Sequence, residues 1–208
     1  MSKNRSQTTM LTLGFLATLN VHLLLFSYSP LVPNIAGEFA LTNAAAGFLF
    51  SVSILTLMVF RIPWGILFDR KGFKKTMTLA LLLMGVFGLA RGFAVDYNSL
   101  LIAQFFLGVG LSGVIPAIPR LVSCWFPREK IGLATGICLA GFPLGDLVAL
   151  SLTPFLLLAL GGWRPIFQVY GAWCLLLVAF WWRFAEDNKK PSRNHRPRLV
   201  SGASSRNS

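Results

Sequence analysis

The sequence predicts an all-α polytopic membrane protein with six transmembrane helices. Of its 208 residues, 55% are apolar and only 12% are charged, whereas an average soluble domain carries about 25% charged residues. The apolar residues also fall in long blocks and do not alternate with polar ones. A soluble fold of this size would lack the charged surface that it needs, and long apolar blocks are typical of membrane spans.

Six apolar segments are each long enough to cross a bilayer, since about 20 helical residues cover roughly 30 Å of hydrocarbon. They are residues 11–33, 44–68, 76–94, 98–122, 132–158 and 164–184. The connections between them are short. We therefore expect a single transmembrane domain over residues 11–184, preceded by a cytoplasmic amino terminus at residues 1–10. Residues 185–208 are polar and basic, and we expect them to form a disordered cytoplasmic tail.

The basic residues are divided unequally between the two sides of the membrane. With six spans both chain ends lie on one side, and that side collects 15 of the 19 lysines and arginines. The opposite side has Arg91 and Arg164. The positive-inside rule then places both ends in the cytoplasm, as for a protein of a bacterial-type plasma membrane, or inner membrane. The net charge of +12 is thus a topology signal, and no nucleic-acid-binding module accompanies it.

One cytoplasmic loop has a more specific residue pattern than a topology signal requires. It reads GILFDRKGFKK, from Gly65 to Lys75. Gly72 permits a tight reversal of the chain, Gly65 permits close approach of a neighbouring helix, and Asp69 stands where it can accept from free backbone N–H groups or pair with a cation. We expect a gate here that changes between states. Its members are Gly65, Asp69, Arg70, Gly72, Lys74, Lys75 and, as the partner of Asp69, Arg120.

This loop resembles the signature between the second and third helices of the major facilitator superfamily, Gly-x-x-x-Asp-(Arg/Lys)-x-Gly followed by basic residues. Phe73 stands where that family usually has a basic residue. The stretches PLVPNIAGEFALTNAAAGFLFS and WFPREKIGLATGI are also similar to the family. The resemblance covers residues 11–184 and implies the amino-terminal half of a twelve-helix secondary transporter, in which two halves rock around a central site for a small solute.

A path lined by two halves is not closed by one half. The resemblance therefore leaves three alternatives: the chain forms a homodimer, it joins a separately made carboxy-terminal half, or it is a truncated or regulatory membrane protein with no transport activity of its own. In the first two cases the sequence predicts a secondary transporter of a small solute, with an anion as one candidate.

Polar side chains within the spans are the candidates for solute binding or ion coupling, because each charge there costs about 2.5–3.5 kcal/mol. Asp146 lies in the sequence GFPLGDL, where Gly141, Pro143 and Gly145 favour a bend. It is either a proton- or cation-responsive carboxylate or a paired structural acid. His22 either binds an anion or relays a proton, or it is a hydrogen-bonded packing residue.

Two further candidates come from the second and fourth segments. Arg61 lies eight residues before Asp69, or about 12 Å in from the loop; it either faces the cavity and binds an anion or reaches the interface. Gln104 stands in Gln-Phe-Phe-Leu-Gly, where many proton-coupled relatives have an arginine. Proton coupling through this position is therefore not expected.

The sequence offers no constellation for an enzyme, a metal or a cofactor. It contains only two histidines and three scattered cysteines, and no spacing among them suits a metal site or a nucleophile–base pair. We therefore expect no catalytic activity, no cofactor and no nucleic-acid partner. The expected partners are a small solute and the lipid bilayer.

Overall fold

The computed structural model describes residues 3–185, with side chains from residue 6 onward, and every regular element in that range is helical. The α-helices are α1 (Lys3–Phe26), α2 (Val32–Glu38), α3 (Asn43–Val59), α4 (Arg61–Lys71), α5 (Phe73–Ala90), α6 (Tyr97–Trp125), α7 (Ile131–Leu139), α8 (Gly141–Leu160) and α9 (Trp163–Phe184). Three short 3-10 turns, η1 (Ser29–Leu31), η2 (Arg91–Phe93) and η3 (Arg128–Lys130), lie between them. Of the predicted tail, only Ala185 is described.

Five stretches of helix are long and apolar enough to span a membrane, and the α3–α4 pair makes a sixth if its two parts count as one span. This agrees with the six predicted segments. The second segment is not straight, however, because α3 and α4 meet at Phe60 with a bend of 45°. The first helical stretch, Ser6–Glu38, is also longer than the predicted segment 11–33.

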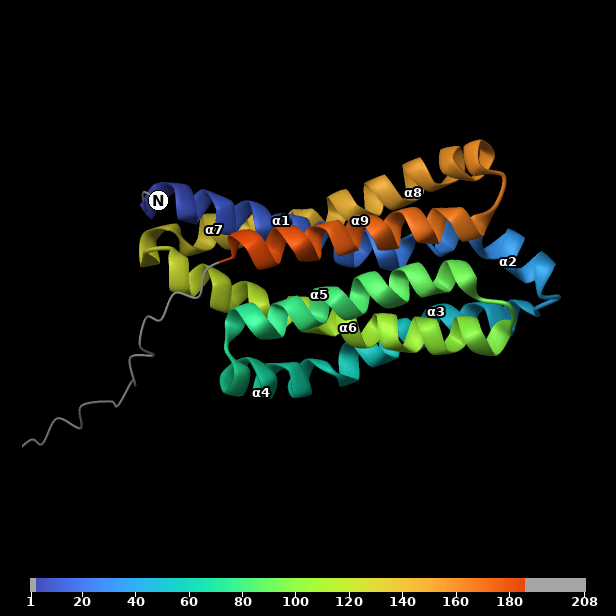
Figure 1. The fold of residues 1–208 in the computed structure, drawn as a ribbon, viewed down its shortest axis with the longest axis horizontal. Coiled ribbons are helices and arrows are strands. Elements are labelled where there is room, and N and C mark those ends of the chain that lie inside the picture. Colours follow the sequence, from blue (N-terminus) through green and yellow to red (C-terminus); the bar gives the residue numbers. More distant parts are fainter. Residues whose placement is uncertain (1–2, 186–208) are drawn as a thin grey trace, which may run out of the picture.

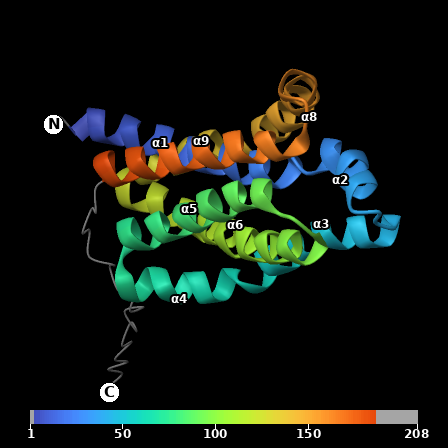
Figure 2. The ribbon, with the colours of Figure 1, turned by 45° about the vertical axis from the view of Figure 1, so that its right-hand side comes forward.

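The helices run side by side along the long axis of the molecule (Figure 1). Helix α5 packs between α6 and α9, α1 packs along α8, and α3 packs along α6. Figure 2 shows α8 on one side of the bundle and α4 on the other, with α5 and α6 between them. The α4–α5 loop lies at the end of the bundle from which α1 starts and at which α9 ends (Figure 1).

Small residues bring these helices into contact. The Cα of Gly171 on α9 faces the backbone of Leu89 on α5, and Gly110 on α6 faces the backbone of Met84 on α5. Any larger side chain would separate these pairs. Helices in lipid have no hydrophobic driving force for association, so close packing of this kind holds them together.

Two spans remain poorly covered within the bundle. In the most apolar window of the α7–α8 span only 17% of the residues are buried, against 61% for α6. Large apolar side chains are exposed on α8, such as Phe155 and Leu158, and on the α3–α4 span, such as Met58 and Ile62. These faces contact either lipid or another protein surface.

Candidate functional site

The central pair of the candidate site joins α1 to α8. His22 Nδ1 and Asp146 Oδ1 lie 2.8 Å apart, a hydrogen-bonding distance, and the two side chains are 27% and 34% exposed. Sequence reasoning named both residues separately but could not place them together. The pair is therefore accessible from outside the bundle while each member satisfies the other.

Glycines on α8 make this pairing possible. A Cβ added at Gly141 would overlap Thr18, and one added at Gly145 would overlap the backbone of Leu19 and lie 3.0 Å from the Cβ of His22. The helix is interrupted next to Gly141, because α7 ends at Leu139 and α8 begins at Gly141, but α7 and α8 form one span without a bend above 40°. Beside this break, the hydroxyl of Thr18 donates to the buried carbonyl O of Cys138.

Aromatic rings surround the histidine. The His22 ring centroid lies 4.5 Å from that of Phe142 and 5.3 Å from that of Phe26. Phe26 in turn contacts Phe50 on α3, with centroids 5.8 Å apart. All three phenylalanines are half-buried. The site therefore combines one titratable pair with an apolar, ring-lined wall, and aromatic faces of this kind suit an organic solute.

In the described part of the chain, neither Gln104 nor Arg61 is hydrogen-bonded or ion-paired with His22 or Asp146. The Gln104 side chain is 1% exposed, and the Ser53 hydroxyl donates to its side-chain and backbone carbonyl oxygens at 3.2 and 3.1 Å. Gln104 thus holds α3 against α6, close to where Gly108 faces Ser53. Arg61 is exposed at the start of α4, directly after the bend at Phe60.

The predicted gate is built around an ion pair between α4 and α6. Arg120 Nη2 lies 2.8 Å from Asp69 Oδ1, and the Arg120 guanidinium sits 5.5 Å from the centre of the Phe68 ring. The two charged side chains are 36% and 71% exposed, so water reaches them. The expected partnership of Asp69 with Arg120 is present.

The two glycines of the loop differ in their roles. Gly72 has φ 83° and ψ 166°, a conformation that is essentially restricted to glycine, and it separates α4 from α5. Gly65 was expected to receive a neighbouring helix, but no heavy atom lies within 4 Å of a Cβ built there. That expectation is wrong for this structure, because the face of α4 that carries Gly65 is not covered by another helix.

The basic residues of the loop are not equivalent. Arg70 and Lys75 are exposed, whereas the Lys74 ammonium lies 5.4 Å from the centre of the Trp182 ring. Phe73, the departure from the family pattern, packs between Phe68 and Trp181, with ring centroids 5.8 and 5.7 Å away. The apolar side chain of Phe73 packs the loop against the end of α9, in place of the contact that a basic residue would make.

Sequence reasoning missed a polar cluster at the opposite end of the bundle. Arg164 was treated only as a topology charge, but its Nη1 donates to Glu38 Oε1 at 2.5 Å, and its Nε and Nη2 donate to the carbonyl O of Ala94. Trp163 Nε1 donates to the other Glu38 oxygen at 2.7 Å. These bonds connect α2, the α5–α6 connection and α9.

Arg91 was also treated only as a topology charge, but it lies inside the bundle. It is 0% exposed, its Nη1 donates to the carbonyl O of Leu24 at 3.0 Å, and its guanidinium lies 4.1 Å from the centre of the Phe167 ring. The flanking glycines were the available signal. Gly88 faces Leu24, and Gly92 faces the backbone of Arg164, so both let α1 and α9 close over the arginine.

Comparison with known proteins gives the same family as the loop signature. The family model described as Major Facilitator Superfamily matches residues 14–206. The chain is 34% identical over 186 residues to the 3-(3-hydroxy-phenyl)propionate transporter of Escherichia coli K12, covering 88% of this chain and 45% of that protein. It is 32% identical over 161 residues to the probable sulfoacetate transporter SauU of Cupriavidus necator, covering 74% of this chain and 36% of that one.

Solved structures agree on the fold. A bacterial homologue of the human lysosomal transporter Spinster, in an inward-facing and unoccupied conformation, superposes with a TM-score of 0.75 at 18% identity. The match covers 91% of this chain and 44% of that one. The chain thus spans less than half the length of each of these relatives.

Proposed function

Because this chain belongs to the major facilitator superfamily, we propose that it forms the amino-terminal half of a secondary transporter that moves a small organic anion by alternating access. It is a multi-pass membrane protein, and the relatives above are named as transporters. Two of those names specify carboxylates, a substituted propionate and sulfoacetate. The observation that carries the proposal is the half-exposed His22–Asp146 pair beside aromatic rings.

The pair links anion binding to protonation. In its paired state the His22 imidazole is held by the Asp146 carboxylate, and a solute carboxylate approaching His22 would be repelled by that negative charge. A proton taken up by the pair cancels its net negative charge and so removes the repulsion. Proton and anion then favour each other's binding, and linkage makes the effect reciprocal. The ring neighbours Phe26 and Phe142 add no competing charge.

Orientation and gating follow from the two ends of the bundle. The positive-inside rule places the end with the α4–α5 loop, and with it both chain ends, in the cytoplasm. The Asp69–Arg120 pair is then a cytoplasmic contact between the second and fourth spans. Because both side chains are partly in water, the pair contributes little to folding, and it is free to break and reform as the halves rock.

A complete path requires a second set of six helices. The exposed apolar faces of the α7–α8 and α3–α4 spans are the surfaces that such a set would cover. A separately made carboxy-terminal half or a second copy of this chain would provide it. The alternative is a truncated or regulatory protein that carries no solute.

The test is solute flux into proteoliposomes under an imposed pH gradient, with 3-(3-hydroxyphenyl)propionate and sulfoacetate as anions and glucose as a neutral control. The chain is reconstituted alone and then with a co-expressed carboxy-terminal half. Asp146→Asn should remove the dependence of anion flux on the pH gradient, and Arg61→Gln should weaken uptake if Arg61 binds the anion. Glu129→Gln changes an exposed carboxyl in the η3 turn, at the start of the α7–α8 span, and serves as the matched control.

Each outcome decides between the candidates. Anion flux that depends on Asp146 and not on Glu129 supports the proposed function. Flux that is unchanged by both Asp146→Asn and Arg61→Gln would remove these residues from the site. An absence of flux for every solute, with and without a second half, would favour the non-transporting alternative.

A further inference from the structure

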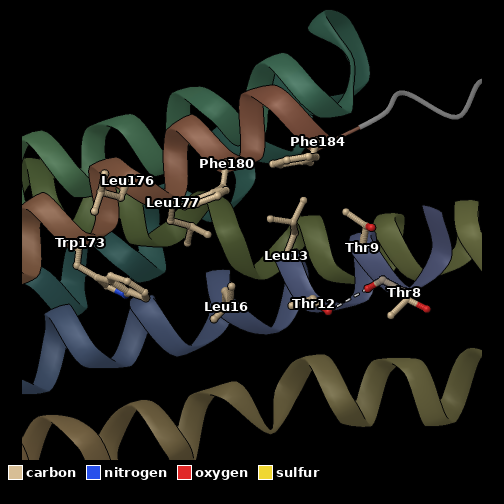
Figure 3. Close-up of a pocket in the computed structure, with 10 residues that line it drawn as sticks. All are labelled: Thr8, Thr9, Thr12, Leu13, Leu16, Trp173, Leu176, Leu177, Phe180 and Phe184. Carbon is tan, nitrogen blue, oxygen red and sulfur yellow. Dashed lines mark hydrogen bonds between the residues drawn. The ribbon is translucent and has the colours of Figure 1, made fainter. Parts of the chain in front are cut away.

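A groove between α1 and α9 lies apart from the site described above. It has a volume of about 350 Å³, within the range of ligand pockets. Leu13 and Leu177 are buried and form its floor, while Leu16, Trp173 and Phe180 line its sides. Figure 3 shows these side chains meeting between the two antiparallel helices. We call this hollow the α1–α9 groove.

We propose that the α1–α9 groove binds one acyl chain of an anionic phospholipid, with the phosphate at the end of the groove near Thr8 and Phe184. The groove belongs to two membrane spans, and its sides include exposed apolar residues of α9, with Trp173 46% and Phe180 56% exposed. Side chains that are apolar and exposed on a span face hydrocarbon, so the surrounding bilayer supplies the occupant.

The dimensions of the groove fit a lipid in one leaflet. Along α1 it extends from Thr8 to Leu16, about 12 Å, and along α9 from Trp173 to Phe184, about 16 Å, at 1.5 Å per residue. Half of the hydrocarbon core of a bilayer is about 15 Å thick. The groove therefore matches the depth of one leaflet and ends before the level of His22.

Charge and polarity distinguish the two ends of the groove. Its deep end is lined by Leu16 and Trp173, whereas its outer end carries the threonines Thr8, Thr9 and Thr12. Thr12 Oγ1 donates to the carbonyl O of Thr8 at 3.0 Å (Figure 3). This polar end suits the ester and phosphate region of a lipid, while the apolar end suits its chain.

A cation lies at that same outer end. Arg183 is exposed on the last turn of α9, and its guanidinium lies 5.4 Å from the centre of the Phe184 ring, which lines the groove. A phosphate held there would be attracted by this charge, whereas the choline group of a zwitterionic lipid would be repelled.

The experiment is native mass spectrometry of the full chain in detergent, titrated with phosphatidylglycerol or phosphatidylcholine of identical acyl chains. We expect one phosphatidylglycerol per chain at saturation. Thr12→Trp places a large ring in the groove and should weaken that binding at least tenfold. Its matched control is Ser51→Trp on α3, since the Ser51 hydroxyl is likewise exposed and bonds to a carbonyl four residues earlier.

A second variant tests the headgroup and keeps the proposal falsifiable if the tryptophan disturbs folding. Arg183→Gln should weaken phosphatidylglycerol binding about fivefold, the effect of one surface cation, and leave phosphatidylcholine binding unchanged. Lys71→Gln removes an exposed cation from α4, on the other side of the bundle (Figure 1), and should have no effect. Equal binding of the two lipids, or binding that is insensitive to both Thr12→Trp and Arg183→Gln, would overturn the proposal.

Discussion

Replacing Gly145 with alanine should destabilise the contact between α1 and α8. The added methyl group would overlap the carbonyl oxygen of Leu19 and lie 3.0 Å from both the Cβ of His22 and the backbone N of Leu23. Two of these three atoms are backbone atoms of a helix, which cannot rotate away as the end of a long side chain can. The two helices must therefore move apart to admit the methyl group.

The expected magnitude follows from two opposing terms. Overpacking a close contact costs about 1–3 kcal/mol, and a contact against rigid backbone belongs at the upper end of that range. Alanine returns about 1 kcal/mol through its higher helix propensity. The net loss is then about 2 kcal/mol, which for a domain of roughly 150–250 residues lowers the unfolding midpoint by about 4–8 °C.

Gly136 is the matched control, because it lies on the same span and a Cβ built there has no heavy atom within 4 Å. Gly136→Ala should leave the midpoint unchanged or raise it slightly. Both variants are compared with the unaltered chain by thermal unfolding in detergent, followed by tryptophan fluorescence. Midpoints that agree within 1 °C for Gly145→Ala and Gly136→Ala would refute the reasoning that α1 and α8 meet through rigid backbone at this point.

Three further predictions concern the ends of helices. Asp69→Asn should change the unfolding free energy by less than about 1 kcal/mol, because its pair with Arg120 is partly exposed. A spectroscopic label at Ser123→Cys, exposed on α6 one turn after Arg120, should report greater mobility when Asp69 is replaced by asparagine than when it is present. Gly72→Ala should lower the free energy of unfolding by about 1–3 kcal/mol, because φ at this residue is 83°. The loss would be measured as a lower unfolding midpoint, and a midpoint equal to that of the unaltered chain would contradict this prediction. Hydrogen bonds from Ser99, through its hydroxyl and its backbone N–H, hold the pKa of Asp96 below its usual value. The cap on α6 is therefore complete at neutral pH and is lost as pH falls through that lowered pKa. Amide hydrogen exchange at the start of α6 should accelerate only in strong acid. If the acceleration began near pH 6, protonation of Asp96 would be excluded as the cause of the faster exchange.

The transmembrane fold was predictable because span length and apolar composition are local properties. Residues 98–122 could be identified as one span without knowing what they contact, and α6 does cover them as a single helix. The bend at Phe60 was not predicted, although the sequence carried a signal for it. Pro63 has no N–H to donate to the carbonyl of Val59, one turn earlier, and so weakens the helix at this point. Composition gives the number of spans, while their shape depends on such breaks and on the contacts between spans.

The candidate site was predictable only in its residue types. An acid and a histidine within spans are conspicuous in the sequence because they are costly in lipid, and so His22 and Asp146 were both named. Their pairing depends on the register of α1 against α8, which Gly141 and Gly145 set through contacts far apart in the sequence. Gln104 was named because many proton-coupled relatives have an arginine at its position, but its hydrogen bonds with Ser53 give it a role between helices.

The burial of Arg91 has a consequence for how the protein is made. Its guanidinium is enclosed by a carbonyl from the first span and the ring of Phe167 from the last. When the third span leaves the ribosome, the first is already available but the last has not been synthesised. During that interval the charge lacks its ring and remains costly in lipid. Arrival of α9 therefore supplies the missing ring and completes the enclosure of the charge, and a chain that ends before α9 would leave the arginine uncovered on that side.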